Sequence, residues 1–408
     1  RSLSTVPSAT IMRVNTPRYL FWVGELAYAS ETIGPRLKIT RIETIPISVP
    51  INPQFAIRSG RGGGHTVSPF LLVKIHTDLG ITGVGEASCT PRWSGEDQFT
   101  GEHLIRTYLE PLLIGANPLE IETLTKSFRL AFAGNYFTKA ALEMALWDIA
   151  GKAAGKPVYE LLGGKVREFV PTKWSVSGVD PEKAAGIAKW AVGQGFAAMK
   201  VKVGIEPEAD VLRVKAVREA IGPLTRLGVD ANGGWTPEVA VKTISQLRQF
   251  GIYFAEQPIA PEDLVHMAGL RKQIGVPLIA DESVYSLQDA MVLAHLGAAD
   301  VLSIYVGKAG GIGPAKKIAE FAESAGLKCT VGSNLELGVG SAAMVHLAMA
   351  TRGIAAEEYP CDIIGPFYYE DDIVREPLPI KPGQARPHDR PGLGVELDEQ
   401  KVQRYRVK

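Results

Sequence analysis

The sequence predicts an α/β protein built on a (β/α)7β modified TIM barrel, preceded in the chain by an α+β capping domain. Three observations predict this fold. The second half alternates strand-like and helix-like segments about every 25 residues. Most of these helical segments end in glycine. The first half of the chain instead has a group of strands followed by a group of helices. A chain of 408 residues is long enough for two such domains.

The first half of the chain has the pattern of an α+β domain. Residues 1–38 show no periodicity and are predicted to be an N-terminal extension. A strand is predicted at 38–50, and strands at 70–76 and 82–86 form a predicted hairpin. Apolar residues then recur at helical spacing. We therefore assign residues 39–165 to the capping domain.

A strand and a helix repeat along residues 166–360, which we assign to the catalytic barrel. The predicted strands are 170–177, 198–204, 226–231, 252–257, 276–282, 301–307, 327–333 and 354–358. The predicted helices are 181–193, 209–221, 237–250, 261–274, 287–296 and 312–325. Parallel strands joined by crossover helices close into a barrel when seven or eight units follow one another. Residues 361–408 show no helical pattern, and we expect them to pack on the capping domain.

Composition excludes several classes of function. Lys+Arg and Asp+Glu both number 44, so the chain lacks the excess of positive charge expected of a nucleic-acid or anionic-membrane partner. No apolar run approaches the roughly 18 residues of a membrane span. Three cysteines without CxxC pairing indicate reduced thiols, so we expect a cytoplasmic enzyme.

Polar residues stand where four consecutive predicted strands end, which is where barrel enzymes carry their active sites. They follow one another at roughly 25 to 28 residues: Lys202 with Lys200 on the same strand face, then Asp230, Glu256 and Asp281. Three carboxylates in one barrel mouth repel one another unless a cation lies between them, and Mg²⁺ is the first choice for oxygen ligands.

The lysines supply the second part of this chemistry. The ammonium group of Lys200 would favour the neutral form of Lys202, which a general base requires. Lys202 would then remove a proton next to a carboxylate, and the metal and Lys200 would stabilise the enolate. A single Lys-x-Lys pair is usually a solvated strand face, and a single Asp at a strand end is usually a helix cap. Four such features at one period rarely occur by chance.

These motifs resemble those of the enolase superfamily, in its mandelate racemase/muconate lactonizing enzyme branch. The resemblance extends over roughly residues 38–394. The matching segments are 83–87 (GVGEA), 141–164 (ALEMALWDIAGKAAGKPVYELLGG), 200–202, 230–232, 256–258, 281–283 and 308–311 (KAGG).

The resemblance implies roles for these residues. Asp230, Glu256 and Asp281 would bind Mg²⁺, Lys202 would be the acid/base catalyst, and Lys200 would contact the carboxylate of a small-molecule substrate. An aspartate as third ligand is similar to the muconate lactonizing subgroup. The end of the seventh predicted strand has no histidine, unlike the mandelate racemase and sugar-acid dehydratase subgroups. The branch also implies a homo-oligomer.

One position departs from the subgroup's pattern. Its members usually carry a second lysine about 24 residues after the third ligand, and here that position is Tyr305. A neutral tyrosine is a poor base at pH 7 but can donate a proton. We therefore expect one-base chemistry, either cycloisomerisation or dehydration, with Tyr305 bound to an oxygen opposite Lys202. A racemase or epimerase of an amino-acid derivative or dipeptide is the alternative.

Four further residues are candidates for substrate binding. Asn232 follows the first acidic strand end, and Glu336 follows the seventh strand, where helix capping is an equal alternative. Arg58 and Arg61 belong to a glycine-rich loop at 58–64, interpreted as a mobile lid or, alternatively, as a disordered surface loop.

Two rival functions remain at this point: a Schiff-base aldolase, which the acidic strand ends disfavour, and a non-catalytic barrel scaffold. The candidate substrates are a muconate-type diacid, an N-acyl amino acid or dipeptide, and a hydroxylated amino acid such as a hydroxyproline.

Overall fold

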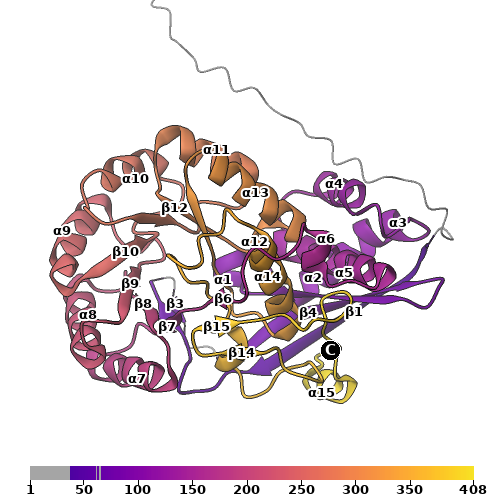
Figure 1. Cartoon of the computed structure of the whole chain (residues 1–408), viewed down its shortest axis with the longest axis horizontal. Coiled ribbons are helices and arrows are strands. Elements are labelled where there is room, and N and C mark those ends of the chain that lie inside the picture. Colours follow the sequence, from indigo (N-terminus) through magenta and orange to yellow (C-terminus); the bar gives the residue numbers. More distant parts are fainter. Residues whose placement is uncertain (1–36, 61, 64–65) are drawn as a thin grey trace, which may run out of the picture. The chain divides into compact units, whose positions relative to one another are not determined.

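The structure, a computed structural model, describes residues 37–60, 62–63 and 66–408 (Figure 1). Almost all of the predicted N-terminal extension, residues 1–36, lies outside the described residues, and so does Arg61. Within the described part, no helix is both long and apolar enough to cross a membrane.

The first half of the described chain is a sheet covered by helices. Strand β1 (Ile39–Pro50) runs antiparallel to β4 (Val67–Thr77), which pairs with β5 (Thr82–Ser88). Helix α5 (Tyr136–Ala154) packs directly on β5. The two backbones are so close that a Cβ atom at Gly85 would collide with the helix backbone. This close approach explains the glycines of the GVGEA segment.

The remaining elements of this half are short. They are β2 (Arg58–Ser59), β3 (Gly62–Gly63), α1 (Pro91–Ser94), α2 (Gln98–Leu104), the π-helix η1 (Ile105–Leu109), α3 (Glu110–Leu113), α4 (Ile121–Ala131) and α6 (Val158–Leu161). Strands β2 and β3 form a small antiparallel hairpin.

The second half is a curled parallel sheet of seven strands surrounded by helices (Figure 1). In sheet order these strands are β7 (Trp174–Val176), β8 (Ala198–Lys202), β9 (Arg226–Asp230), β10 (Ile252–Glu256), β11 (Leu278–Ala280), β12 (Val301–Ile304) and β13 (Lys328–Val331). The helices are α7 (Pro181–Gln194), α8 (Pro207–Ile221), α9 (Pro237–Leu247) with η2 (Arg248–Phe250), α10 (Leu264–Arg271), α11 (Leu287–Leu296), α12 (Val306–Ala309), α13 (Ile312–Ser324) and α14 (Gly338–Ala350). The predicted α/β barrel fold is confirmed.

The segment that closes the barrel, in space between the edge strands β13 and β7, differs from the prediction. Residues 354–358 were predicted as an eighth strand, but they form no regular strand. Two isolated parallel bridges, Cys329 to Ile354 and Thr172 to Cys361, connect this segment to β13 and to the chain before β7. The segment therefore joins the two edges of the sheet with far fewer ladder hydrogen bonds than a strand would make.

The C-terminal segment packs on the first half of the chain. It contains a 3-10 helix η3 (Gly365–Tyr368), the strands β14 (Ile380–Lys381) and β15 (Gln384–Ala385), which join β6 (Val170–Pro171), and the helix α15 (Glu399–Tyr405). The expectation that it holds no helix was wrong, since residues 399–405 form α15, capped by Asp398. A helix of this length is too short to show a helical pattern in the sequence. Lys74 of β4 contacts Glu399 at 2.7 Å, and the Val407 amide donates to the Pro46 carbonyl at 3.0 Å.

Candidate active site

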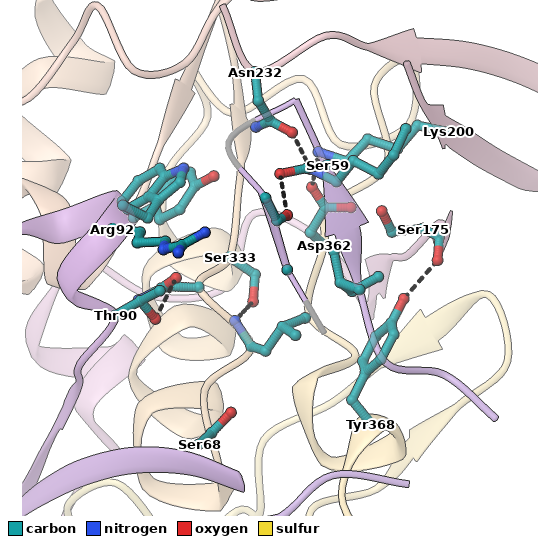
Figure 2. A pocket seen from close by; sticks show the side chains of 18 of the residues that line it. Ser59, Ser68, Thr90, Arg92, Ser175, Lys200, Asn232, Ser333, Asp362 and Tyr368 are labelled. Carbon is teal, nitrogen blue, oxygen red and sulfur yellow. Dashed lines mark hydrogen bonds and ion pairs between the residues drawn. The ribbon is translucent and has the colours of Figure 1, made fainter. Parts of the chain in front are cut away.

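A pocket of about 950 Å³, its open mouth included, lies beside the C-terminal ends of the barrel strands. Lys200 and Lys202 of β8, Asn232 after β9 and Tyr305 after β12 line it from the barrel. Residues of α1 and of the β2–β3 hairpin line it from the first half of the chain (Figure 2).

Lys200 is the centre of a buried ion-pair network. Its Nζ lies 2.8 Å from Glu256 Oε1, 3.1 Å from Asp230 Oδ2 and 2.9 Å from Asp362 Oδ2. Burial by itself lowers the pKa of Lys200, but the charges of Asp362, Glu256 and Asp230 outweigh it and hold that pKa well above its ordinary value. Lys200 is therefore a fixed cation and not a base.

Lys202 is the more accessible of the two lysines. Its side chain is 12% exposed, against 4% for Lys200. Its Nζ lies 2.6 Å from Asp230 Oδ2 and 3.0 Å from Asn232 Oδ1. Strand β8 places Lys202 directly opposite Asp230 of β9, so the parallel register brings the two together. An amine with access to the pocket and a fixed orientation is suited to proton transfer.

The three predicted metal ligands lie on neighbouring strand ends. Asp230 and Glu256 are register partners, and Asp281 follows β11, the next strand. Within residues 37–60, 62–63 and 66–408, no group of three His, Cys, Asp or Glu side chains is arranged to hold a metal ion. Instead, Lys200 contacts the first two carboxylates, and Asp281 accepts hydrogen bonds from Lys308 at 2.5 Å and Tyr305 at 2.6 Å.

The donor chemistry nevertheless fits Mg²⁺, which prefers carboxylate oxygens. Glu256 Oε2 is buried and has no hydrogen-bond partner among the described atoms. Burial raises the pKa of Glu256 to about 8 although Lys200 lowers it, so this site has more carboxylate than the lysines neutralise. Asp230, Glu256 and Asp281 are thus the residues that would hold the ion.

Tyr305 faces the pocket from the N-terminus of α12. Its side chain is almost fully buried, and its ring stacks on Trp93 of α1 with centroids 5.2 Å apart and an interplanar angle of 11°. Burial and the charge of Asp281 raise the pKa of Tyr305 well above its ordinary value, so it remains a proton donor. The ammonium group of Lys308 lies 4.2 Å from the ring centroid, and Lys308 does not line the pocket.

The candidate substrate-binding residues have different placements. Asn232 lines the pocket, where its Nδ2 donates to Glu282 Oε1 at 2.9 Å. Arg58 is not a lining residue, although its neighbours Ile57 and Ser59 are. Arg61 lies outside the described residues.

Glu336 is buried within its own loop and does not line the pocket. Its Oε2 accepts a hydrogen bond from Ser333 at 2.6 Å, and its Oε1 accepts one from the Asn334 amide at 3.1 Å. Both donors belong to the loop before α14, and the N-cap position of that helix is Leu337 without a side-chain cap, so Glu336 stabilises its loop and does not cap the helix.

Sequence reasoning missed two residues that support Lys200. Asp362 lines the pocket, and Lys173 lies 3.3 Å from its Oδ1. Asp362 follows the segment that takes the place of the eighth strand, so the rule that active sites lie at strand ends could have found it. It was missed because that segment was predicted to end at residue 358.

The chain is similar in sequence and in structure to known proteins. Residues 43–163 match the family model for the mandelate racemase / muconate lactonizing enzyme N-terminal domain, and residues 183–401 match that of the enolase C-terminal domain-like family. The chain is 35% identical to N-succinyl-L-Arg/Lys racemase of Bacillus cereus, over 91% of this chain and 98% of the relative. The crystal structure of that racemase has a TM-score of 0.87, over 91% and 98% of the two chains.

Two further relatives have different activities. Muconate cycloisomerase 1 of Rhodococcus opacus is 32% identical over 89% of this chain and 96% of its own. A dipeptide epimerase of Enterococcus faecalis, whose structure is a complex with Mg and the dipeptide L-Leu-L-Tyr, has a TM-score of 0.83 at 32% identity, over 88% and 99% of the two chains. The relatives share the superfamily reaction type but not one substrate. The chain belongs to the mandelate racemase/muconate lactonizing enzyme family of the enolase superfamily.

Proposed function

We propose that this protein catalyses one-base proton transfer at the carbon next to a carboxylate, with Lys202 as the base, leading to cycloisomerisation or dehydration of a small carboxylic acid. The observation that carries this proposal is the placement of the amines. Of the described residues, the lysines that line the pocket are Lys200 and Lys202, and both come from β8. Lys308 lies behind the ring of Tyr305, bound to Asp281 and to the Ser303 carbonyl.

Lys200 and Lys202 have different roles, which follow from their accessibility and charge. Lys200, a permanent cation, attracts the substrate carboxylate and opposes the negative charge that develops on it. Lys202 in its neutral form accepts the α-proton, and the C–H electron pair moves into the carboxylate. Mg²⁺ bound by Asp230, Glu256 and Asp281 would supply further positive charge beside that carboxylate.

Tyr305 completes the reaction from the other wall of the pocket. In a dehydration its hydroxyl would donate a proton to the departing hydroxide, giving water. In a cycloisomerisation a second carboxylate oxygen of the substrate would add to a C=C bond, whose π electrons would move into the α-carboxylate. Lys202 as the ammonium group would then protonate the α-carbon, the reverse of the abstraction step, and Tyr305 would donate a hydrogen bond to the ring oxygen. In both cases the tyrosine acts as a donor, in agreement with the raised pKa that burial and Asp281 give it.

Racemisation or epimerisation is the second candidate, and the racemase and epimerase relatives favour it. It needs proton delivery to the face of the substrate opposite Lys202. Tyr305 is the pocket residue with a proton to give there, but its low acidity makes it a slow donor to carbon.

A substrate panel in D₂O with Mg²⁺ tests the proposal. Proton NMR would follow muconates, N-acyl amino acids, dipeptides and hydroxyprolines, since each candidate reaction moves a proton at the α-carbon. Deuterium incorporation with conversion to a lactone or a dehydrated product would support the proposal. Inversion at the α-carbon without another product would support the epimerase instead, and no incorporation with any acid would count against both.

A further inference from the structure

The pocket wall formed by α1 presents a cation that the one-base chemistry does not use. Arg92 lines the pocket, and Figure 2 shows it on the side opposite Lys200. The ammonium groups of the two lysines are already paired, because Lys200 contacts three carboxylates and Lys202 contacts Asp230. Among the described residues, no hydrogen bond or ion pair involves the guanidinium group of Arg92.

The backbone that carries Arg92 is fixed on both sides. Next in sequence, Trp93 stacks on Tyr305. Before it, the Thr90 hydroxyl donates to Asn334 Oδ1 at 3.3 Å, and Asn334 Nδ2 donates to the Ser88 carbonyl at 2.9 Å. An exposed arginine without a partner is ordinary, but one held at the pocket wall by a stacked neighbour has a defined position relative to the reacting residues.

The position of the guanidinium group is further limited by the β2–β3 hairpin. A Cβ atom added to Gly62 would lie 2.6 Å from Arg92 Nη1, so the guanidinium group lies against the hairpin backbone. The group thus lies between the hairpin and the pocket, with its other N–H donors available to a ligand. A planar fork of such donors matches a carboxylate.

We propose that Arg92 is a specificity-determining residue that binds a second carboxylate of the substrate, remote from the one beside the reacting carbon. The substrate class would then be acids with two carboxylates. This inference rests on the proposed function, because it takes the first carboxylate to lie beside Lys200. Among the candidate substrates it selects a diacid, or an N-acyl amino acid whose acyl group ends in a carboxylate, over a hydroxyproline.

Binding of non-reacting probes tests Arg92 without requiring turnover. Isothermal titration calorimetry with Mg²⁺ present would compare succinate, glutarate, adipate and pimelate with the monoamide of each. For at least one chain length the diacid should bind roughly tenfold to a hundredfold more tightly than its monoamide. Arg92→Met should abolish that preference, and Arg92→Lys should keep part of it.

A matched control removes a positive charge elsewhere on the first half of the chain. Arg129 of α4 is exposed and does not line the pocket, so Arg129→Met should keep the wild-type preference. An equal preference in Arg92→Met and wild type, or no preference in wild type at any length, would overturn the inference. Neither result affects the proposed function, which the D₂O experiment tests separately.

Discussion

The Nζ of Lys200 lies 2.9 Å from Oδ2 of Asp362, so the segment that closes the barrel supplies a counterion to the second barrel strand. Asp362 also faces the buried ammonium group of Lys173 at 3.3 Å. One carboxylate thus contacts two buried lysines, one on β8 and one directly before β7. The position of Lys200 in the pocket therefore depends on a residue that is distant in sequence and is not one of the predicted metal ligands.

Asp362→Asn should destabilise the protein and lower its activity. The substitution leaves two buried ammonium groups with less compensation, which should cost roughly 2–4 kcal/mol in the free energy of unfolding. Urea denaturation measures this cost. Glu358→Gln is the control, because it breaks an exposed pair with Lys328 and should cost less than about 1 kcal/mol. Equal effects of the two substitutions would show that the Asp362 network does not stabilise the fold.

Tyr305→Phe should lower turnover roughly a hundredfold while keeping the stacking on Trp93. The ring remains, but the proton donor opposite Lys202 and the 2.6 Å hydrogen bond to Asp281 are lost. Steady-state kinetics with the substrate found in the panel measures this. Tyr253→Phe is the control, because the hydroxyl of Tyr253 is buried without a partner in the described part of the chain. Full turnover by Tyr305→Phe would exclude the hydroxyl from the reaction.

Gly311→Ala should destabilise the protein much more than Gly326→Ala. Gly311 has φ of 141°, and a Cβ there would collide with the Glu143 carboxyl group, which accepts hydrogen bonds from the Ile312 and Gly313 amides at 2.7 and 2.8 Å. We expect a cost above roughly 3 kcal/mol.

Gly326 supplies the comparison for backbone strain alone. It has φ of 76°, and a Cβ there would have nothing within 4 Å. Its substitution should cost about 1–2 kcal/mol. Similar unfolding free energies for the two alanine variants, measured by urea denaturation, would contradict the role of Glu143 as a cap that joins α5 to α13.

The contribution of His346 to stability should fall as the pH decreases from about 6.5 to about 4. Burial lowers the pKa of His346 from 6.5 to about 4, and its ring accepts from the Tyr159 amide and contacts the Leu393 carbonyl. The unfolded chain therefore takes up a proton at a higher pH than the folded protein does. The resulting loss of stability is on the order of 3 kcal/mol, complete below pH 4 and absent above pH 7.

Urea denaturation at pH 7, 5.5 and 4 tests this dependence. His346→Gln should remove the His346 contribution to it, while His266→Gln should not, because the side chain of His266 is 65% exposed. The same pH dependence in wild type and His346→Gln would show that another group is responsible.

The sequence was sufficient to predict the barrel and the order of the residues at its mouth. Alternation placed Lys200 and Lys202 on one face, and the parallel register then brought Lys202 opposite Asp230. Helix α14 was missed because it is buried on every side and so shows no apolar periodicity. The segment at 354–358 was predicted as a strand, although within it only Ile354 makes a bridge.

The partners of each site residue could not be predicted in the same way. Periodicity gives the face of a strand on which a residue lies, but not which charge across the barrel contacts it. The pairing of Lys200 with Asp362 depends on how the closing segment crosses between the two edges of the sheet. The docking of Trp93 on Tyr305 depends on how α1 packs against the barrel, which no local pattern specifies.

The most direct test of the central claim, that Lys202 is the base, is α-proton exchange in D₂O with Mg²⁺ by Lys202→Ala and Tyr305→Phe. Proton NMR would follow the substrate that the wild-type enzyme converts. We predict that exchange is lost in Lys202→Ala and continues in Tyr305→Phe, because only Lys202 removes the proton. Exchange at the wild-type rate in Lys202→Ala would contradict the account and assign the base to another residue.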